Sequence, residues 1–189
     1  MASLADDPLA EVLARIAART PAPASGTAAA LTCATAAALT AMVAAYAGDA
    51  PRARSAAERA VALRERALEL AQRDLASYRP VLEALRLSAS DPRRPAAVAR
   101  ALSGAAEVPL EISQVAAEVA SLASQLAPGA GRHALGDACT AATLAEAACR
   151  SAALLVEVNL RGQDDERVAR ARGLARSAAA ERERTLALV

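Results

Sequence analysis

Apolar and helix-forming residues recur along the chain at helical spacing, and no stretch alternates β-branched with polar residues as a strand does. Proline and glycine occur at intervals that separate one helical segment from the next. We therefore predict an all-α fold, an up-and-down bundle of about five to six Ala-rich helices in a single domain covering residues 1–189. The expected helices span about 8–19, 27–47, 53–87, 96–126, 133–160 and 164–186.

The two longest expected helices each contain a proline, Pro80 in the third and Pro109 in the fourth. Proline removes a backbone hydrogen bond, so we expect Pro80 to bend its helix and Pro109 to interrupt the other. The third helix also carries a seven-residue apolar spacing, which predicts a single packing seam along it. The seam consists of Val61, Leu68, Leu75 and Leu82.

Two expected helices, 27–47 and 133–160, are apolar nearly all round. No charge occurs from Ala22 to Gly48, yet alanine and threonine dominate there, which favours a helix buried in a bundle over a membrane span. One domain of this size cannot easily enclose both helices, so an exposed face indicates a homodimer. The N-terminus lacks the pattern of a signal peptide. We expect a cytoplasmic protein with no membrane partner.

The amino-acid composition argues against two classes of function, nucleic-acid binding and catalysis through a lysine Schiff base. Of the 189 residues 54% are hydrophobic, mostly alanine, and Tyr46 and Tyr78 are the only aromatic residues. A core of such small side chains depends on close approach of helices over long contacts. The net charge of +1, with both signs mixed along the chain, argues against a nucleic-acid partner. All 22 basic residues are arginine, which excludes chemistry through a lysine Schiff base.

The cysteines favour a structural interpretation. Cys33, Cys139 and Cys149 are odd in number, lack a CxxC spacing and lie in apolar helical segments. They fit small buried hydrophobic residues better than disulfides or zinc ligands. Because the chain has only one histidine, we expect no metal site.

Asp137 is the clearest candidate for chemistry, because it begins a helical stretch whose next eight residues are uncharged. An acid near a helix N-terminus is also stabilised by the helix dipole, so a structural and a functional role both remain open. His133, the only histidine, lies four residues earlier and could share its helix face. A capping or solvated role is the alternative for His133.

Three further features could bind a polar ligand. Asp74 and Tyr78 are one helical turn apart and could bind a polar ring or transfer a proton, although a solvated acid is the alternative. Asn159 follows an apolar run and needs a backbone or ligand partner. The Ser25-Gly26-Thr27 segment starts a helix whose free N–H groups favour anions, although a simple N-cap explains it equally well.

The order of these features resembles the cyclodeaminase/cyclohydrolase family over nearly the whole chain. The matching segments are Thr20-Pro21-Ala22-Pro23, Ala28-Ala29-Ala30, Met42-Val43, Asp74 with Tyr78, Ala106-Glu107-Val108-Pro109-Leu110-Glu111, His133-Ala134-Leu135-Gly136-Asp137, Ala147-Ala148-Cys149-Arg150-Ser151-Ala152 and Val158-Asn159-Leu160. The resemblance implies a helical dimer that binds a one-carbon derivative of tetrahydrofolate and needs no further cofactor.

Members of this family either hydrolyse the methenyl bridge of methenyltetrahydrofolate or cyclise formiminotetrahydrofolate with loss of ammonia. The resemblance implies catalytic roles for Asp137, as acid/base or pterin-recognising carboxylate, and for Asp74. Ser25, Gly26 and Thr27 would hold a polar or anionic part of the folate, and Tyr78, His133 and Asn159 would complete the pocket. We favour hydrolysis, because cyclodeamination is typically paired with a formiminotransferase domain, for which this chain has no room.

The chain also departs from the pattern of that family. Ala24 and Ser25 replace two glycines of its turn, Asp49-Ala50-Pro51-Arg52 replaces a basic segment, and Leu155 replaces an amide. These departures support an alternative from another class: a non-catalytic helical dimer of the same fold whose ligand is lost or changed.

Overall fold

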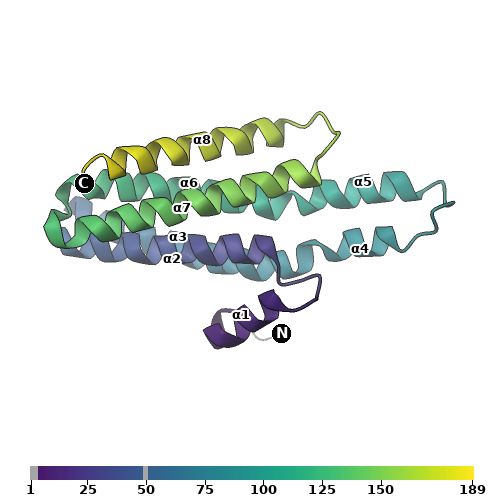
Figure 1. Cartoon of the computed structure of the whole chain (residues 1–189), viewed down its shortest axis with the longest axis horizontal. Coiled ribbons are helices and arrows are strands. Elements are labelled where there is room, and N and C mark those ends of the chain that lie inside the picture. Colours follow the sequence, from purple (N-terminus) through teal and green to yellow (C-terminus); the bar gives the residue numbers. More distant parts are fainter. Residues whose placement is uncertain (1–3, 49–50) are drawn as a thin grey trace.

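The computed structural model describes residues 4–48 and 51–189, and within these ranges the chain is helical with no strand (Figure 1). The all-α prediction is therefore confirmed. Asp49 and Ala50, part of the segment expected to differ from the family, lie outside the described residues. The α-helices are α1 (Leu9–Ala17), α2 (Ser25–Tyr46), α3 (Pro51–Ser77), α4 (Arg79–Leu85), α5 (Arg94–Ala105), α6 (Glu107–Leu126), α7 (Gly131–Asn159) and α8 (Glu166–Leu186), with short 3₁₀ helices at Leu4–Asp6 and Ala127–Gly129.

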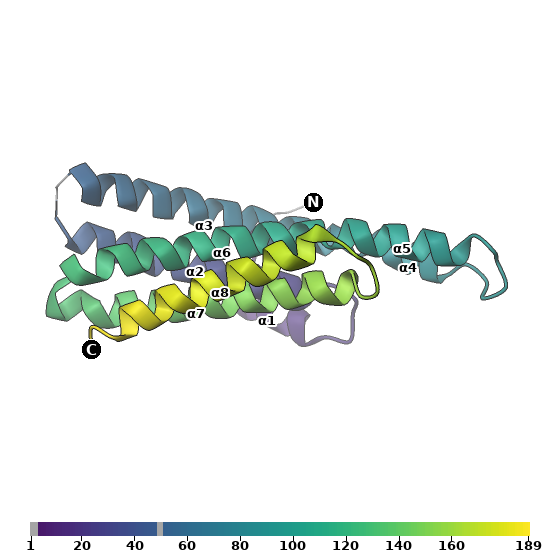
Figure 2. The ribbon, with the colours of Figure 1, turned by 90° about the horizontal axis from the view of Figure 1, so that it is seen from above.

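Helices α2, α3, α6 and α7 pack lengthwise around a common core, and α8 covers α6 and α7 (Figures 1 and 2). Each long segment runs antiparallel to the one before it, which gives the up-and-down order predicted from the sequence. Helices α4 and α5 pack against each other and project beyond the bundle at one end. The N-terminus of α2 and the C-terminus of α7 lie at this same end.

Pro109 interrupts its helix as expected, and Pro80 divides its helix rather than only bending it. Helix α3 ends at Ser77 and α4 begins at Arg79, so that Pro80 falls in the first turn of α4. Pro109 likewise falls in the first turn of α6, after α5 has ended at Ala105. A proline costs little in a first turn, where its missing N–H has no intrahelical partner. The chain breaks at both points near one end of the bundle, where the α4–α5 hairpin leaves it.

The predicted seam on the third helix is confirmed only in part, since Leu68 and Leu75 pack against core clusters but do not form the most buried stripe of the helix. Its four residues, of which Leu82 falls in α4, are only half-buried, whereas the buried positions of α3 lie on a neighbouring stripe. That stripe consists of Ala53, Ala56, Ala60, Leu63, Ala67, Leu70 and Ala71. Alanines face the neighbouring helices because a small side chain lets two backbones approach closely, and the larger residues then fill the flanks.

The cysteines are buried and free, as predicted. Cys33 and Cys149 belong to the central apolar cluster formed by α2, α3, α6, α7 and α8. Burial is the main cause that raises the pKa of each of these two thiols to about 12. Both therefore remain protonated at neutral pH and act as small core residues.

Helices α2 and α7 are long and apolar enough to cross a membrane by length and composition alone. About half of each candidate span, 50% in α2 and 56% in α7, is buried inside the bundle. Such burial is typical of the core helices of a bundle. The expected absence of a membrane partner and the cytoplasmic location stay predictions.

Close packing of alanine predicts a strong position dependence for enlarging substitutions. Ala178 of α8 is fully buried in the central cluster, and Ala180 on the same helix is exposed. We expect Ala178→Leu to lower the free energy of unfolding in urea by roughly 1–3 kcal/mol, because the added methyl groups have no space. Ala180→Leu is the matched control and should change it by less than about 0.5 kcal/mol. Equal effects at both positions would contradict the packing described.

Candidate functional site

The first turn of α2 is built around a carboxylate from another helix. Asp74 of α3 reaches the N-terminus of α2, where the side chain of Thr27 donates a hydrogen bond to its Oδ2 at 2.9 Å. The backbone N–H of Thr27 also donates to this carboxylate. Ala24, the residue before α2, makes no side-chain cap of its own. Asp74 therefore supplies the cap of α2 from a neighbouring helix.

Gly26 makes this approach possible. A Cβ atom at Gly26 would lie 2.2 Å from Oδ1 and 2.8 Å from Oδ2 of Asp74, far inside van der Waals contact. Any side chain at this position would force the carboxylate away from Thr27. The Ser25-Gly26-Thr27 segment was predicted to hold a polar or anionic part of the ligand, but the Asp74 carboxylate already occupies the donors of Thr27. A second anion there would meet like charge.

The surroundings of Asp74 shift its protonation equilibrium. Burial is the largest influence and raises the pKa of the carboxyl above its ordinary value of 3.8, while the two hydrogen bonds from Thr27 oppose the rise. The outcome is an acid held in a fixed position whose affinity for a proton is higher than that of a solvated aspartate. These are the properties expected of a group that transfers a proton.

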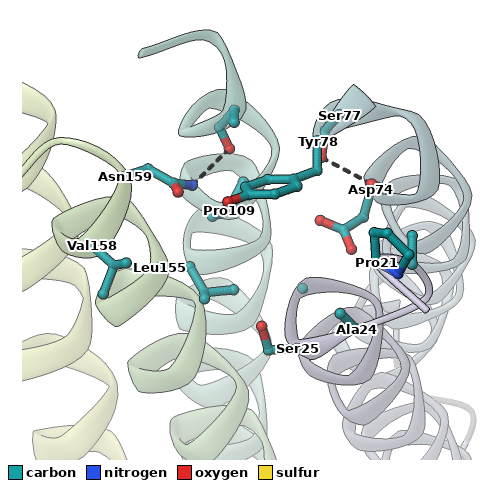
Figure 3. Close-up of a pocket in the computed structure, with 13 residues that line it drawn as sticks. Pro21, Ala24, Ser25, Asp74, Ser77, Tyr78, Pro109, Leu155, Val158 and Asn159 are labelled. Carbon is teal, nitrogen blue, oxygen red and sulfur yellow. Dashed lines mark hydrogen bonds between the residues drawn. The ribbon is translucent and has the colours of Figure 1, made fainter. Parts of the chain in front are cut away.

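A cavity of about 250 Å³ opens beside this carboxylate. Its walls come from the turn before α2, from the end of α3, from the break between α5 and α6, and from the end of α7 (Figure 3). The lining residues are Pro21, Ala22, Ala24, Ser25, Gly26, Asp74, Ser77, Tyr78, Ala105, Pro109, Leu155, Val158 and Asn159. Apolar walls with a few convergent polar groups are typical of small-molecule sites.

Tyr78 and Asn159 complete the polar part of the cavity. The ring of Tyr78 extends from the end of α3 towards Pro109 and is 37% exposed (Figure 3). Asn159 donates from Nδ2 to the backbone carbonyl of Ala105 at 3.1 Å, which holds the amide at the end of α7. The structure therefore brings Ser25, Gly26, Asp74, Tyr78 and Asn159 together around one cavity, from the start of α2, the end of α3 with the residue after it, and the end of α7. Thr27 does not line the cavity and is fully buried.

Asp137 and His133 lie elsewhere. Both belong to the N-terminal part of α7, whereas the cavity is at its C-terminal end. Because a helix rises about 1.5 Å per residue, Asp137 is about 27 Å along α7 from Leu155. His133 is exposed and Asp137 is half-buried. The expectation that these two residues share a pocket with Asp74 is not met within one chain.

Several lining residues were not among the sequence candidates. Ser77, Ala105, Pro109 and Val158 carry little chemical signal of their own. The two helix breaks place Ser77, Ala105 and Pro109 at the cavity, and the prolines were the only sequence signal for those breaks. No group of three or more His, Cys, Asp or Glu residues within the described ranges could hold a metal ion.

Comparisons with known proteins identify the family and the fold of the chain. Residues 8–176 match the sequence model of a family described as formiminotransferase-cyclodeaminase. The fold is similar to the solved structure of a formiminotetrahydrofolate cyclodeaminase from Thermotoga maritima, with a TM-score of 0.85 and 23% identity. That similarity covers 96% of this chain and 94% of the other. No protein with a curated description gives a significant match.

The raised pKa of Asp74 predicts how stability depends on pH. The folded protein holds this proton more tightly than the unfolded chain, so the contribution of Asp74 to stability is full below pH 3.8 and is lost as pH rises through its folded-state value. Asp74→Asn keeps an acceptor for Thr27 and has no charge to lose. We expect the variant to gain stability relative to the parent as pH rises from below 3.8 to neutral.

Unfolding in urea across this pH range provides the measurement. Asp164→Asn, the same substitution at an exposed position, is the matched control. If the free energy of unfolding of Asp74→Asn instead falls relative to that of the parent as pH rises, the raised pKa is contradicted.

Proposed function

Because the chain belongs to the formiminotransferase-cyclodeaminase family, we propose that it is an enzyme acting on a one-carbon derivative of tetrahydrofolate. The observation that carries this proposal is the position of the Asp74 carboxylate. Thr27 holds it by hydrogen bonding, and the missing side chain of Gly26 leaves space for it. The carboxylate lines the same cavity as Tyr78 and Asn159. Asp74 is the acid/base in our account. Tyr78 supplies a ring against which the bicyclic pterin-type ring stacks, and Asn159 offers its amide oxygen to a ring donor.

The chemistry requires one well-placed proton carrier. In formiminotetrahydrofolate, N10 attacks the formimino carbon and the proton of N10 passes to the formimino nitrogen, which gives a tetrahedral carbon bonded to N5, N10 and an amino nitrogen. A second proton moves to the amino nitrogen, the bond between that nitrogen and the carbon breaks, ammonia leaves and the methenyl bridge remains. A carboxyl group with a raised pKa is suited to donate that proton, because more of it is protonated near neutral pH. Hydrolysis of the bridge passes through a tetrahedral carbon that carries a hydroxyl in place of the amino group. Asp74, as the base, takes a proton from the attacking water, and the bond from this carbon to N5 then breaks, which leaves a formyl group on N10.

We place cyclodeamination ahead of hydrolysis. Both the family description and the description of the similar solved structure name cyclodeamination. The solved chain is matched over 94% of its length, so a chain of about this size carries the cyclodeaminase description. Chain length, which was the main argument from the sequence for hydrolysis, therefore gives no preference for that reaction.

The assignment predicts activity that depends on Asp74. We expect the purified protein to release ammonia from 5-formiminotetrahydrofolate, followed by absorbance of the methenyl product and by an ammonia assay. Asp74→Asn should lower kcat by about 10²- to 10⁴-fold, the range typical of an acid/base group. Asp164→Asn is the matched control and should leave the rate unchanged.

Methenyltetrahydrofolate is the second substrate, assayed beside a no-enzyme control because it hydrolyses spontaneously. Hydrolysis above background without ammonia release would reassign the reaction to a cyclohydrolase. Asp137→Asn compares the other predicted acid, and we expect it to keep most of the activity because Asp137 lies outside the cavity. A folded protein without activity on either substrate would favour the non-catalytic alternative.

We also propose that two copies of the chain associate through the faces of α2 and α7 that the bundle leaves open. Helix α2 contains no charged residue between Ser25 and Tyr46, so every side chain that it exposes is uncharged. Met42 on α2 and Leu154 and Val158 on α7 are large exposed apolar residues. The uncharged surface of α2, together with the exposed apolar residues of the adjacent α7, suits an isologous contact with a second copy.

Light scattering after gel filtration tests this association. We expect twice the chain mass of 19.2 kDa for the parent protein. Thr35→Arg places a charge in the middle of the exposed face of α2 and should give a protein with the mass of one chain. Ala180→Arg on α8 is the matched control and should leave the dimer intact. A parent protein that elutes with the mass of one chain would contradict the proposal.

A further inference from the structure

A second cavity lies directly beside the first, between the α4–α5 hairpin and the end of α3. Its volume is about 610 Å³, and Ser77 contributes to both cavities. Gly104 lines the second cavity and its neighbour Ala105 lines the first. The two cavities are therefore adjacent along one surface of the molecule, at the end of the bundle from which the hairpin projects (Figure 1).

The walls of the second cavity suit an elongated ligand with an apolar and an anionic part. Most of its lining is apolar and comes from Pro80, Ala84, Leu87, Ala97 and Ala101. Two charged residues face it, Glu83 from α4 and Arg100 from α5. No acceptor within the described ranges of the chain pairs with the Arg100 guanidinium.

Charge on the hairpin favours an anion. Residues 79–105 contain five arginines against Glu83 and Asp91, a net charge of +3 in a chain whose total is +1. Asp91 is already paired with Arg93, through contacts of 2.8 and 3.1 Å. A local positive potential of this kind attracts and orients carboxylates.

From this juxtaposition we propose that the groove between α4 and α5 binds the tail of the folate substrate, with Arg100 binding a carboxylate of its glutamate. The inference rests on the proposed function. A one-carbon bridge beside Asp74 joins N5 of the ring system to N10, and N10 carries the aminobenzoyl-glutamate tail. The first cavity, at about 250 Å³, is below the roughly 300–1,000 Å³ of a typical ligand site. The tail therefore extends past Ser77 into the adjoining groove, where the apolar wall receives the aminobenzoyl ring.

Glu83 should affect the binding of an anionic tail in the direction opposite to Arg100. Its carboxylate faces the same groove and repels an anionic tail, whereas Arg100 attracts it. Loss of either charge should change affinity only for ligands that carry the glutamate. A purely structural role for either residue would affect ligands with and without the glutamate alike.

Isothermal titration calorimetry with two stable ligands tests the inference on the full chain. The probes are 5-formyltetrahydrofolate and 5-formyltetrahydropteroate, which differ only in the glutamate. We expect Arg100→Gln to weaken the first ligand by about tenfold, as for the loss of one charge-assisted contact, and to leave the second unchanged. Glu83→Gln should tighten the first ligand by a factor of about two to five and leave the second unchanged. Arg54→Gln, at an exposed arginine in the first turn of α3, is the matched control and should alter neither.

The outcomes separate the two proposals. If the parent binds both ligands and Arg100→Gln changes neither affinity, or both equally, the tail inference is overturned and the proposed function stands. If the parent binds neither ligand, the proposed function fails and this inference fails with it. Tighter binding by Arg100→Gln, or weaker binding of the glutamate ligand by Glu83→Gln, would also overturn the placement of the tail.

Discussion

The site depends on one interaction, the hydrogen bonding of the Asp74 carboxylate to the N-terminus of α2. Thr27 holds the carboxylate through its hydroxyl and its backbone N–H, and the missing side chain of Gly26 leaves the space that the carboxylate fills. The contact joins α2 to α3 at the end of the bundle where the chain breaks. It also leaves Asp74 half-buried, which raises its pKa and gives a structural cap the properties of a proton carrier.

The alanine-rich bundle supplies the rigidity that such a contact requires. Fully buried alanines on α2, α3, α6, α7 and α8 bring these helices close together, so their ends have fixed relative positions. Breaks before Pro80 and Pro109 then open the chain at one end only, where Tyr78, Ala105 and Pro109 line the cavity. The apolar core and the polar cavity are thus two consequences of the same arrangement of helices.

Much of this could be predicted from the sequence, because helix periodicity, prolines and glycines are local signals. These signals predicted the helical class, the up-and-down order and the buried cysteines. They also marked as candidate site residues Asp74, Tyr78, Asn159 and the Ser25-Gly26-Thr27 turn. The seam on the third helix was right only in part, because alanines occur on several faces of α3 and the sequence does not show which of those faces is buried. Asp137 stood out as an isolated charge, yet its position along α7 relative to Asp74 depends on how helices pair, which no local pattern contains. The contact across Gly26 is likewise a property of two helices together.

A crystal structure of the protein with 5-formyltetrahydrofolate, which carries a one-carbon group on N5, tests the central claim most directly. Our account predicts that this group lies within hydrogen-bond distance of the Asp74 carboxyl, with the ring system between Tyr78 and Asn159. A ligand bound at the opposite end of α7 beside Asp137, or one whose one-carbon group points away from Asp74, would contradict it.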